Sequence, residues 1–175
     1  MESIIGAEAA AGESPNAFSQ LESIEIRDCP KMTNVVGPQL LPRLQNLRRV
    51  EIWFASNMEE IIVMPSPQPF PAATSVLLPF LTNIWVDQCP KMKRVITFEL
   101  FMLLPNLQEI TVKNCKRMKE VIGNELERGG GAMVENNNTS NLLLFPDASS
   151  ADQSRARQLT LRLHFLEELE SICSH

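Results

Sequence analysis

The sequence lacks the features that mark a membrane-spanning, secreted or nucleic-acid-binding protein. Its 175 residues contain no uninterrupted apolar stretch of about 18 residues, the length that a membrane helix needs. The formal net charge is −5, so the basic excess usual in nucleic-acid-binding proteins is missing. The N-terminal segment carries Glu2 where a signal peptide would be positive. We therefore expect a soluble, cytoplasmic chain that binds neither nucleic acid nor membrane and whose thiols stay reduced.

Histidine is scarce, and the sequence shows no arrangement suited to catalysis. The two histidines, His164 and His175, have no cysteine or serine nucleophile arranged around them. We therefore expect no enzyme activity. The apolar fraction of 44% is sufficient for one domain with a substantial core.

The sequence does contain an internal repeat. Six apolar residues recur in the same phase, separated by steps of 3, 2, 3, 3 and 3 residues. The four complete copies are Leu21, Ile24, Ile26, Cys29, Met32 and Val35; Leu47, Val50, Ile52, Ala55, Met58 and Ile61; Leu81, Ile84, Val86, Cys89, Met92 and Val95; and Leu107, Ile110, Val112, Cys115, Met118 and Val121. A degraded fifth copy comprises Leu161, Leu163, Leu166, Leu169 and Ile172, with Gln158 in place of its leading leucine. Successive complete copies begin 26, 34 and 26 residues apart, and periods of this size indicate a solenoid.

The spacing predicts the local structure of each unit. The two-residue step from Ile24 to Ile26 puts both side chains on one face of a strand, while Glu25 points to the other face. The three-residue steps fit neither a strand nor a helix, but they suit a coil that turns one apolar side chain inward at each corner. The pattern LxxLxLxxC is that of the leucine-rich repeat. We therefore predict an α/β solenoid of about five repeats, with a curved parallel sheet and an irregular or short helical convex side.

Three of the four cysteines, Cys29, Cys89 and Cys115, fall at the same position of their repeats. This position turns inward just after the strand, where a thiol serves as a small apolar side chain and a weak donor to buried backbone groups. Metal sites need clustered thiolates, and each cysteine stands alone in its repeat, so we expect a structural role and no metal ion. A disulfide between Cys89 and Cys115 is the alternative, which a reducing compartment disfavours.

Two segments, LPNLQEITVKNCKRMKEVIG and LPFLTNIWVDQCPKMKRVI, resemble the repeats of a known family. They are similar to the C-terminal leucine-rich repeats of plant intracellular immune receptors, the nucleotide-binding leucine-rich-repeat proteins of the coiled-coil class. The resemblance covers about residues 18–122 and 158–175, and it implies protein recognition in defence. The phosphate-binding motif of those receptors is missing, because the glycines at 129–131 precede Ala and Met rather than Lys. We therefore expect no cofactor, and in particular no ATP or ADP.

Composition and phase together predict how the chain is organised. The predicted parts are a mobile N-terminal arm at 1–17, repeats one to four at 18–122 with a proline-rich loop at 65–79, a largely disordered insert at 123–157, and a degenerate terminal repeat at 158–175. The loop explains the longer 34-residue offset. Within the insert, the LLLF at 142–145 is interpreted as the remnant of a decayed repeat that still packs on the solenoid.

The phase also identifies the side chains that point away from the core. The predicted protein-binding residues on the concave face are Glu25, Arg27, Arg49, Glu51, Trp53, Asn83, Trp85, Asp87, Glu109 and Lys113. Trp53 and Trp85 lie on adjacent strands and either form an exposed hot spot, cover each other, or lie beneath the proline-rich loop. Glu25 and Glu51 are expected side by side, with nearby arginines offsetting their repulsion; a basic partner segment is the alternative.

A second candidate surface follows the cysteines of repeats three and four. This basic stripe consists of Lys91, Lys93, Arg94, Lys116, Arg117 and Lys119. Solvated charge is one interpretation. The other is contact with an acidic domain, which the resemblance suggests for packing against a nucleotide-binding module.

These features favour a recognition module that binds a pathogen effector or a monitored host protein, or contacts a nucleotide-binding domain. Two alternatives remain. A substrate adaptor for a ubiquitin ligase also uses cysteine-containing repeats near 26 residues, but it needs an F-box, for which the 17-residue arm is too short. A receptor fragment without independent function is expected to be poorly soluble or to self-associate through an exposed strand edge.

Overall fold

The computed structural model describes residues 18–63, 76–123, 139–146 and 156–173. The predicted arm at 1–17 and most of the proline-rich loop at 65–79 lie outside these described residues. So does most of the insert, whose described part is 139–146.

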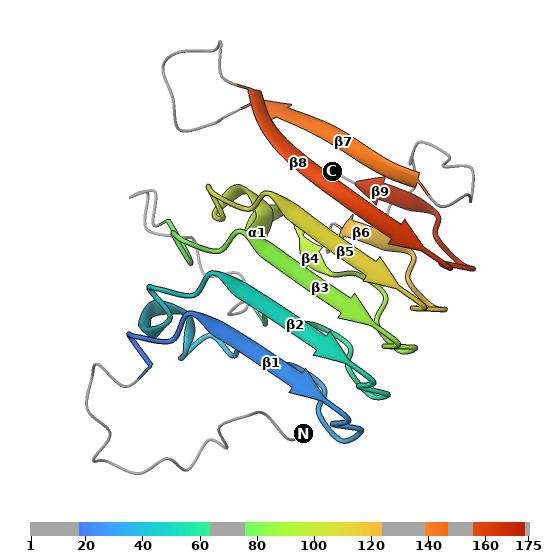
Figure 1. Ribbon diagram of the computed structural model, residues 1–175, viewed down its shortest axis with the longest axis horizontal. Coiled ribbons are helices and arrows are strands. Elements are labelled where there is room, and N and C mark those ends of the chain that lie inside the picture. The colour runs from blue at the N-terminus through green and yellow to red at the C-terminus, as the bar shows by residue number, and fades with distance from the viewer. Residues whose placement is uncertain (1–17, 64–75, 124–138, 147–155, 174–175) are drawn as a thin grey trace.

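Each repeat contributes one strand to a six-stranded sheet (Figure 1). The five parallel strands are β1 (Ser23–Arg27), β2 (Arg49–Trp53), β3 (Asn83–Asp87), β5 (Glu109–Lys113) and β8 (Ala156–His164). Their registers follow the repeat, with Ile24 opposite Val50, Val50 opposite Ile84, and Ile110 opposite Leu161. The arrangement is compatible with a leucine-rich-repeat fold, because equivalent positions of successive units lie side by side.

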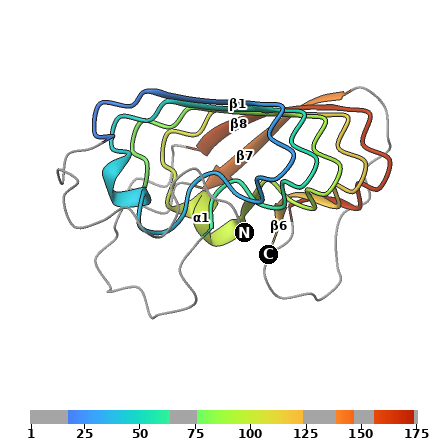
Figure 2. The same ribbon diagram turned by 90° about the horizontal axis from the view of Figure 1, so that it is seen from below.

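The remaining elements form the other side of the molecule (Figure 2). A second parallel sheet has the order β4-β6-β9, and a short α-helix lies beside it. These elements are β4 (Ile96–Thr97), β6 (Glu120–Gly123), β9 (Ser171–Cys173), the 3-10 helix η1 (Leu41–Arg43) and α1 (Phe98–Met102). Helix α1 begins after Thr97, whose hydroxyl accepts a hydrogen bond from the Leu100 N–H at 3.2 Å.

The core lies between the two sheets and is built from the repeated apolar positions. All six positions of the second, third and fourth copies are at most 2% exposed, which confirms the inward phase read from the sequence. In the first copy Leu21, Ile24, Cys29 and Met32 are only partly buried. Because no unit buries its apolar side alone, the first copy lacks the neighbour that would complete it among the described residues.

The repeated cysteines turn inward, as predicted. The thiols of Cys29, Cys89 and Cys115 donate to the carbonyls two residues earlier, at 3.3, 3.6 and 3.2 Å respectively, and all three are free thiols. A hydrogen bond with Cys89 and burial raise the pKa of the Cys115 thiol far above its usual range. The same contact lowers the pKa of Cys89, against the effect of burial. These contacts confirm a structural role.

The residue that follows each strand adopts a left-handed backbone conformation. These residues are Asp28, Phe54, Gln88, Asn114 and Phe165, with φ between 52° and 57°. The N–H groups of the first four continue the ladder between repeats; for example, the Phe54 N–H donates to the Asp87 carbonyl at 3.1 Å. The strands therefore end together at one edge of the sheet.

Four strands were not predicted. Three of them, β4, β6 and β9, form a sheet on the side that was expected to be irregular or short helical. The fourth lies in the predicted insert. Thr139–Pro146 forms β7, which pairs antiparallel with β8 at the end of the six-stranded sheet. It includes the LLLF segment that was interpreted as a packed remnant. Strand β8 begins at Ala156, before the predicted start of the terminal repeat at 158, because its first residues pair with β7.

Candidate functional site

The predicted binding residues lie on the face of the six-stranded sheet that points away from the core, which we call the open face. It carries the alternate side chains of β1, β2, β3 and β5 between the buried ones. Three of the predicted residues are exposed, namely Glu25, Arg27 and Arg49. The other seven are half-buried, namely Glu51, Trp53, Asn83, Trp85, Asp87, Glu109 and Lys113. The outward Thr111 is buried, and its hydroxyl donates to Glu109 at 3.1 Å.

Two tryptophans are the largest side chains of the open face. Trp53 lies opposite Asp87, and Trp85 lies opposite Glu51, so the rings are diagonal neighbours on adjacent strands. The Arg27 guanidinium lies 4.2 Å from the Trp53 ring centroid, and the Lys113 ammonium lies 4.5 Å from that of Trp85. Each ring is therefore covered in part by a cation from a neighbouring repeat.

The indole nitrogen of Trp85 is buried and has no hydrogen-bond partner among the described side chains and backbone. Such a group is costly to leave unpaired, by about 1–3 kcal/mol, so its indole N–H is a donor still available to an acceptor that can reach it. The alternative in which the proline-rich loop covers the rings falls mostly on residues outside those described.

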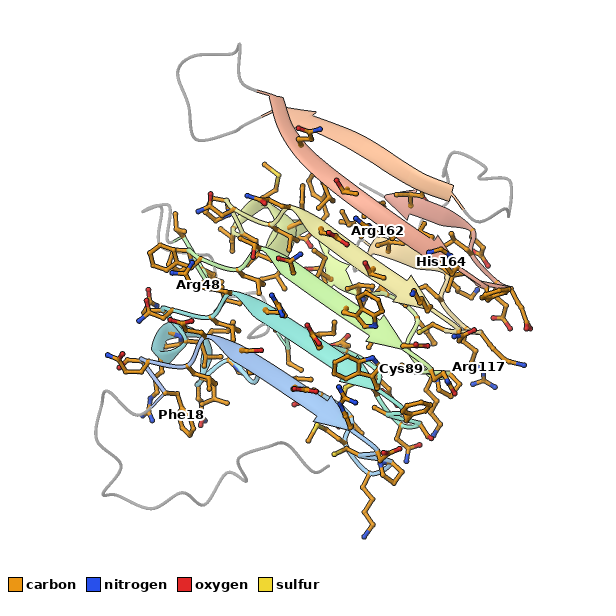
Figure 3. All side chains as sticks on the ribbon, viewed as in Figure 1. Phe18, Arg48, Cys89, Arg117, Arg162 and His164 are labelled. Carbon is orange, nitrogen blue, oxygen red and sulfur yellow. The ribbon has the colours of Figure 1, made fainter. Side chains whose placement is uncertain are left out.

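The charges of the open face are paired along it. Glu25 and Glu51 lie opposite each other, as predicted, and Arg27 and Arg49 offset their repulsion with contacts of 2.6 and 3.5 Å to Glu25 and Glu51 respectively. Further along the sheet, the Arg162 guanidinium lies 3.0 Å from Glu109 (Figure 3). Each such exposed pair contributes at most about 1 kcal/mol. The pairs fix side-chain positions and leave the open face nearly neutral.

The basic stripe is only partly paired. Glutamates of neighbouring repeats approach three of its members: Arg94 with Glu60 at 3.4 Å, Lys116 with Glu167 at 3.6 Å, and Lys119 with Glu170 at 2.9 Å. Lys91, Lys93 and Arg117 are exposed and have no acidic partner among the residues that the structure describes. The stripe thus consists of three paired and three unpaired cations.

Sequence reasoning missed two exposed aromatic residues, Phe54 and Phe165, which are 45% and 71% exposed. Both directly follow a strand, beside the open face. Aligning the repeats in phase places them in the same column as Asp28, Gln88 and Asn114. An apolar ring in a column of otherwise polar residues was the signal that could have identified them.

Neither a metal site nor a membrane-spanning element was found in the described ranges. No three His, Cys, Asp or Glu side chains gather there in a way that could hold a metal ion. Within the same residues, none of the helices has the length and apolar character needed to cross a membrane.

The stacked parallel strands and the buried periodic columns define a leucine-rich-repeat protein. A family model described as "Plant disease resistance protein RPS2-like, leucine-rich repeats" matches residues 70–175, well over half of the chain. The chain belongs to this family of plant disease resistance leucine-rich repeats. No curated protein and no solved structure matched it. Strands β1 and β2 precede the matched region but continue its register.

Proposed function

We propose that this chain is a short leucine-rich-repeat solenoid that recognises another protein in plant defence. The partner is a pathogen effector or a host protein under surveillance, and it binds the open face in the cytoplasm. The resemblance to coiled-coil-class receptors supports this setting, and the chain acts by binding, without catalysis or a cofactor. The family match supports the broader role of protein interaction in defence.

The observation that carries the proposal is the pair of half-buried tryptophans on adjacent strands. Tryptophan and arginine are enriched among the residues that dominate binding energy, and Arg27 lies over Trp53. A partner that displaces or shares these cations gains ring surface together with the Trp85 indole donor. The paired charges around the rings hold the surface in place before binding.

The test is affinity capture from plant cell extract with the wild-type chain, a Trp53→Ala, Trp85→Ala variant and an Arg48→Ala control. Arg48 lies at the amino ends of the strands and contacts Phe80, away from both tryptophans (Figure 3). Circular dichroism confirms that each variant is folded. A captured protein is then purified, and its affinity for the three chains is measured by calorimetry.

We expect a discrete protein that binds wild type and the Arg48→Ala variant alike. The tryptophan variant should bind it at least about tenfold more weakly, because each lost ring removes more than about 1 kcal/mol of contact. Equal affinity for all three chains would show that the open face is not the recognition surface.

A further inference from the structure

The turns that follow the strands carry a second group of exposed residues, distinct from the open face. We call this group the turn rim; it consists of Phe54, Gln88, Lys91, Asn114, Arg117 and Phe165. They come from four successive repeats, in the order in which β2, β3, β5 and β8 stack. Arg117 lies beyond the carboxyl ends of the strands (Figure 3).

Phe54 and Phe165 occupy backbone positions that disfavour them. Their φ angles are 57° and 54°, in the left-handed region that Asn, Asp and Gly tolerate and bulky side chains avoid. The equivalent turn of repeat four has Asn114, which suits this conformation. Both phenylalanines therefore strain the folded chain at a position where a small polar residue would not.

The side chains of Phe54 and Phe165 are also exposed to solvent. Phe54 is 45% and Phe165 71% exposed, and neither has a cation over its ring among the described residues. By contrast, the exposed Phe80 has the Arg48 guanidinium 5.5 Å from its ring centroid. Backbone strain and exposure both destabilise the free protein, so neither ring is explained by folding.

Two unpaired cations lie between the rings. Lys91 and Arg117 occupy equivalent turn positions on the two intervening repeats, and both are exposed without an acidic partner in the described part of the chain. The acidic group nearest these cations along the chain is Asp87, whose carboxylate accepts a hydrogen bond from the Asn114 side-chain amide at 2.9 Å. Glu167, which contacts Lys116, and Glu168 lie in the last repeat, beside Phe165 in sequence. The rim thus has an apolar residue at each end and, between them, two unpaired cations and one carboxylate that Asn114 already engages.

We propose that the turn rim binds an acidic segment of another protein that carries two apolar side chains. The rings lie three strand spacings apart, about 14 Å at about 4.8 Å per strand. An extended segment covers that length in four residues, so apolar residues at i and i+4 meet the two rings. A carboxylate at i+2 lies on the same side, between Lys91 and Arg117, and the side-chain amide of Gln88 lies next to it.

The chemistry favours such a segment over a nucleic acid. The chain has a net charge of −5, and two unpaired cations neutralise too few phosphates for tight binding of a polyanion. The apolar rings at both ends require an apolar counterpart, which an acidic peptide with leucines supplies.

The probe is a capped peptide with the core Leu-Ser-Glu-Ser-Leu, titrated into the isotope-labelled full chain and followed by NMR. Peptides with Lys in place of Glu, or Ser in place of both Leu, serve as controls, and a single-stranded oligonucleotide is titrated in parallel. The protein variants are Phe54→Asn with Phe165→Asn, Lys91→Glu with Arg117→Glu, and Trp85→Ala as a variant outside the rim.

We expect the probe to shift the side-chain amide signal of Gln88. Both rim double variants should weaken binding at least about tenfold, as expected for losing one buried apolar contact or inverting the charge. The Trp85→Ala variant should bind like wild type, which separates this proposal from the one for the open face. Equal binding of the Lys and Glu peptides, or tighter binding of the oligonucleotide, would overturn the proposal.

A stability measurement removes the ambiguity of a misfolded variant. The Phe54→Asn, Phe165→Asn chain should have a higher midpoint of thermal unfolding than wild type, because Asn relieves strain in the left-handed region. Higher stability with weaker binding identifies residues kept for recognition. A lower midpoint would show that the rings stabilise the fold, and the proposal would then fail.

Discussion

Cys89 and Cys115 occupy the same position of adjacent repeats and pack against each other across the boundary between them. Both side chains are fully buried, and their thiols contact each other as well as backbone carbonyls of their own repeats. The same column holds Ala55 in the second repeat. A small side chain therefore satisfies the packing, and the thiol adds a second donor to a carbonyl that already accepts a backbone N–H from the preceding repeat.

The raised pKa of Cys115 gives a prediction for alkaline pH. Above the ordinary thiol pKa of 9.0 the unfolded chain releases a proton that folded Cys115 keeps, so the folded state binds more protons. The free energy of unfolding should therefore be unaffected by this group below about pH 9. At higher pH it should fall, by up to about 1.4 kcal/mol per pH unit. Urea unfolding from about pH 8 to 10 measures this slope.

The control for this prediction is Cys89→Ala, Cys115→Ala, which removes both thiols of the contacting pair and keeps residues that Ala55 shows the column can hold. Its free energy of unfolding should be lower at neutral pH and should vary less above pH 9. The sequence contains no tyrosine, and the remaining cysteines and the lysines, which titrate in or near this range, are common to both proteins. Identical slopes for the two proteins would mean that the pair of thiols ionises equally in the folded and unfolded states.

At the scale of the strand, most of the fold follows from the repeat spacing. The two-residue step in each copy of the repeat predicts the five parallel strands. The repeat phase also predicts that Ile52 is buried and that its neighbour Trp53 points outward. Strand β7 could not be located this way, because its pairing with β8 depends on contacts outside the repeat pattern. The cations over Trp53 and Trp85 depend on side-chain conformations across strands, which periodicity does not specify. The phase of the repeat therefore predicts which residues form the open face, but it does not predict which cations lie over the tryptophan rings.

Strand β7 is expected to stabilise β8 by covering its edge, and proline substitutions test this pairing. Backbone N–H groups of an edge strand alternate between facing its partner and facing outward. Of Leu143→Pro and Leu144→Pro, one therefore removes a hydrogen bond to β8 and the other does not. We expect the first to lower the free energy of unfolding by about 1–2 kcal/mol and to promote self-association.

Urea unfolding and light scattering distinguish the two proline variants, and Leu143→Val and Leu144→Val serve as controls for the loss of side-chain volume. A clear difference between the two proline variants supports the paired strand. If both behave like the valine controls, β7 does not contribute to stability in solution.

At the scale of the whole molecule, the strands of the large sheet follow the order of the repeats, so each repeat pairs with its neighbours along the chain. The core is therefore complete in the middle and incomplete at the β1 end, where four apolar residues of the first copy remain partly exposed. Stability in such a stack is expected to be lowest at an uncovered end. The outer edge of β1, which has no strand partner among the described residues, is where exchange with solvent should begin.

Matched substitutions of two methionines at the same repeat position test whether stability is lower at the β1 end than in the middle of the sheet. Met32 is partly buried at the end of the stack, whereas Met92 is fully buried in the third repeat. Met92→Ala creates a cavity enclosed by two neighbours and should lower the free energy of unfolding by about 2–5 kcal/mol, while Met32→Ala should cost about 1 kcal/mol. Native-state hydrogen exchange should show the amides of β1 opening before those of β3. Equal losses for the two variants, with uniform exchange across the strands, would mean that the first repeat is covered in solution and that the stack unfolds as one unit.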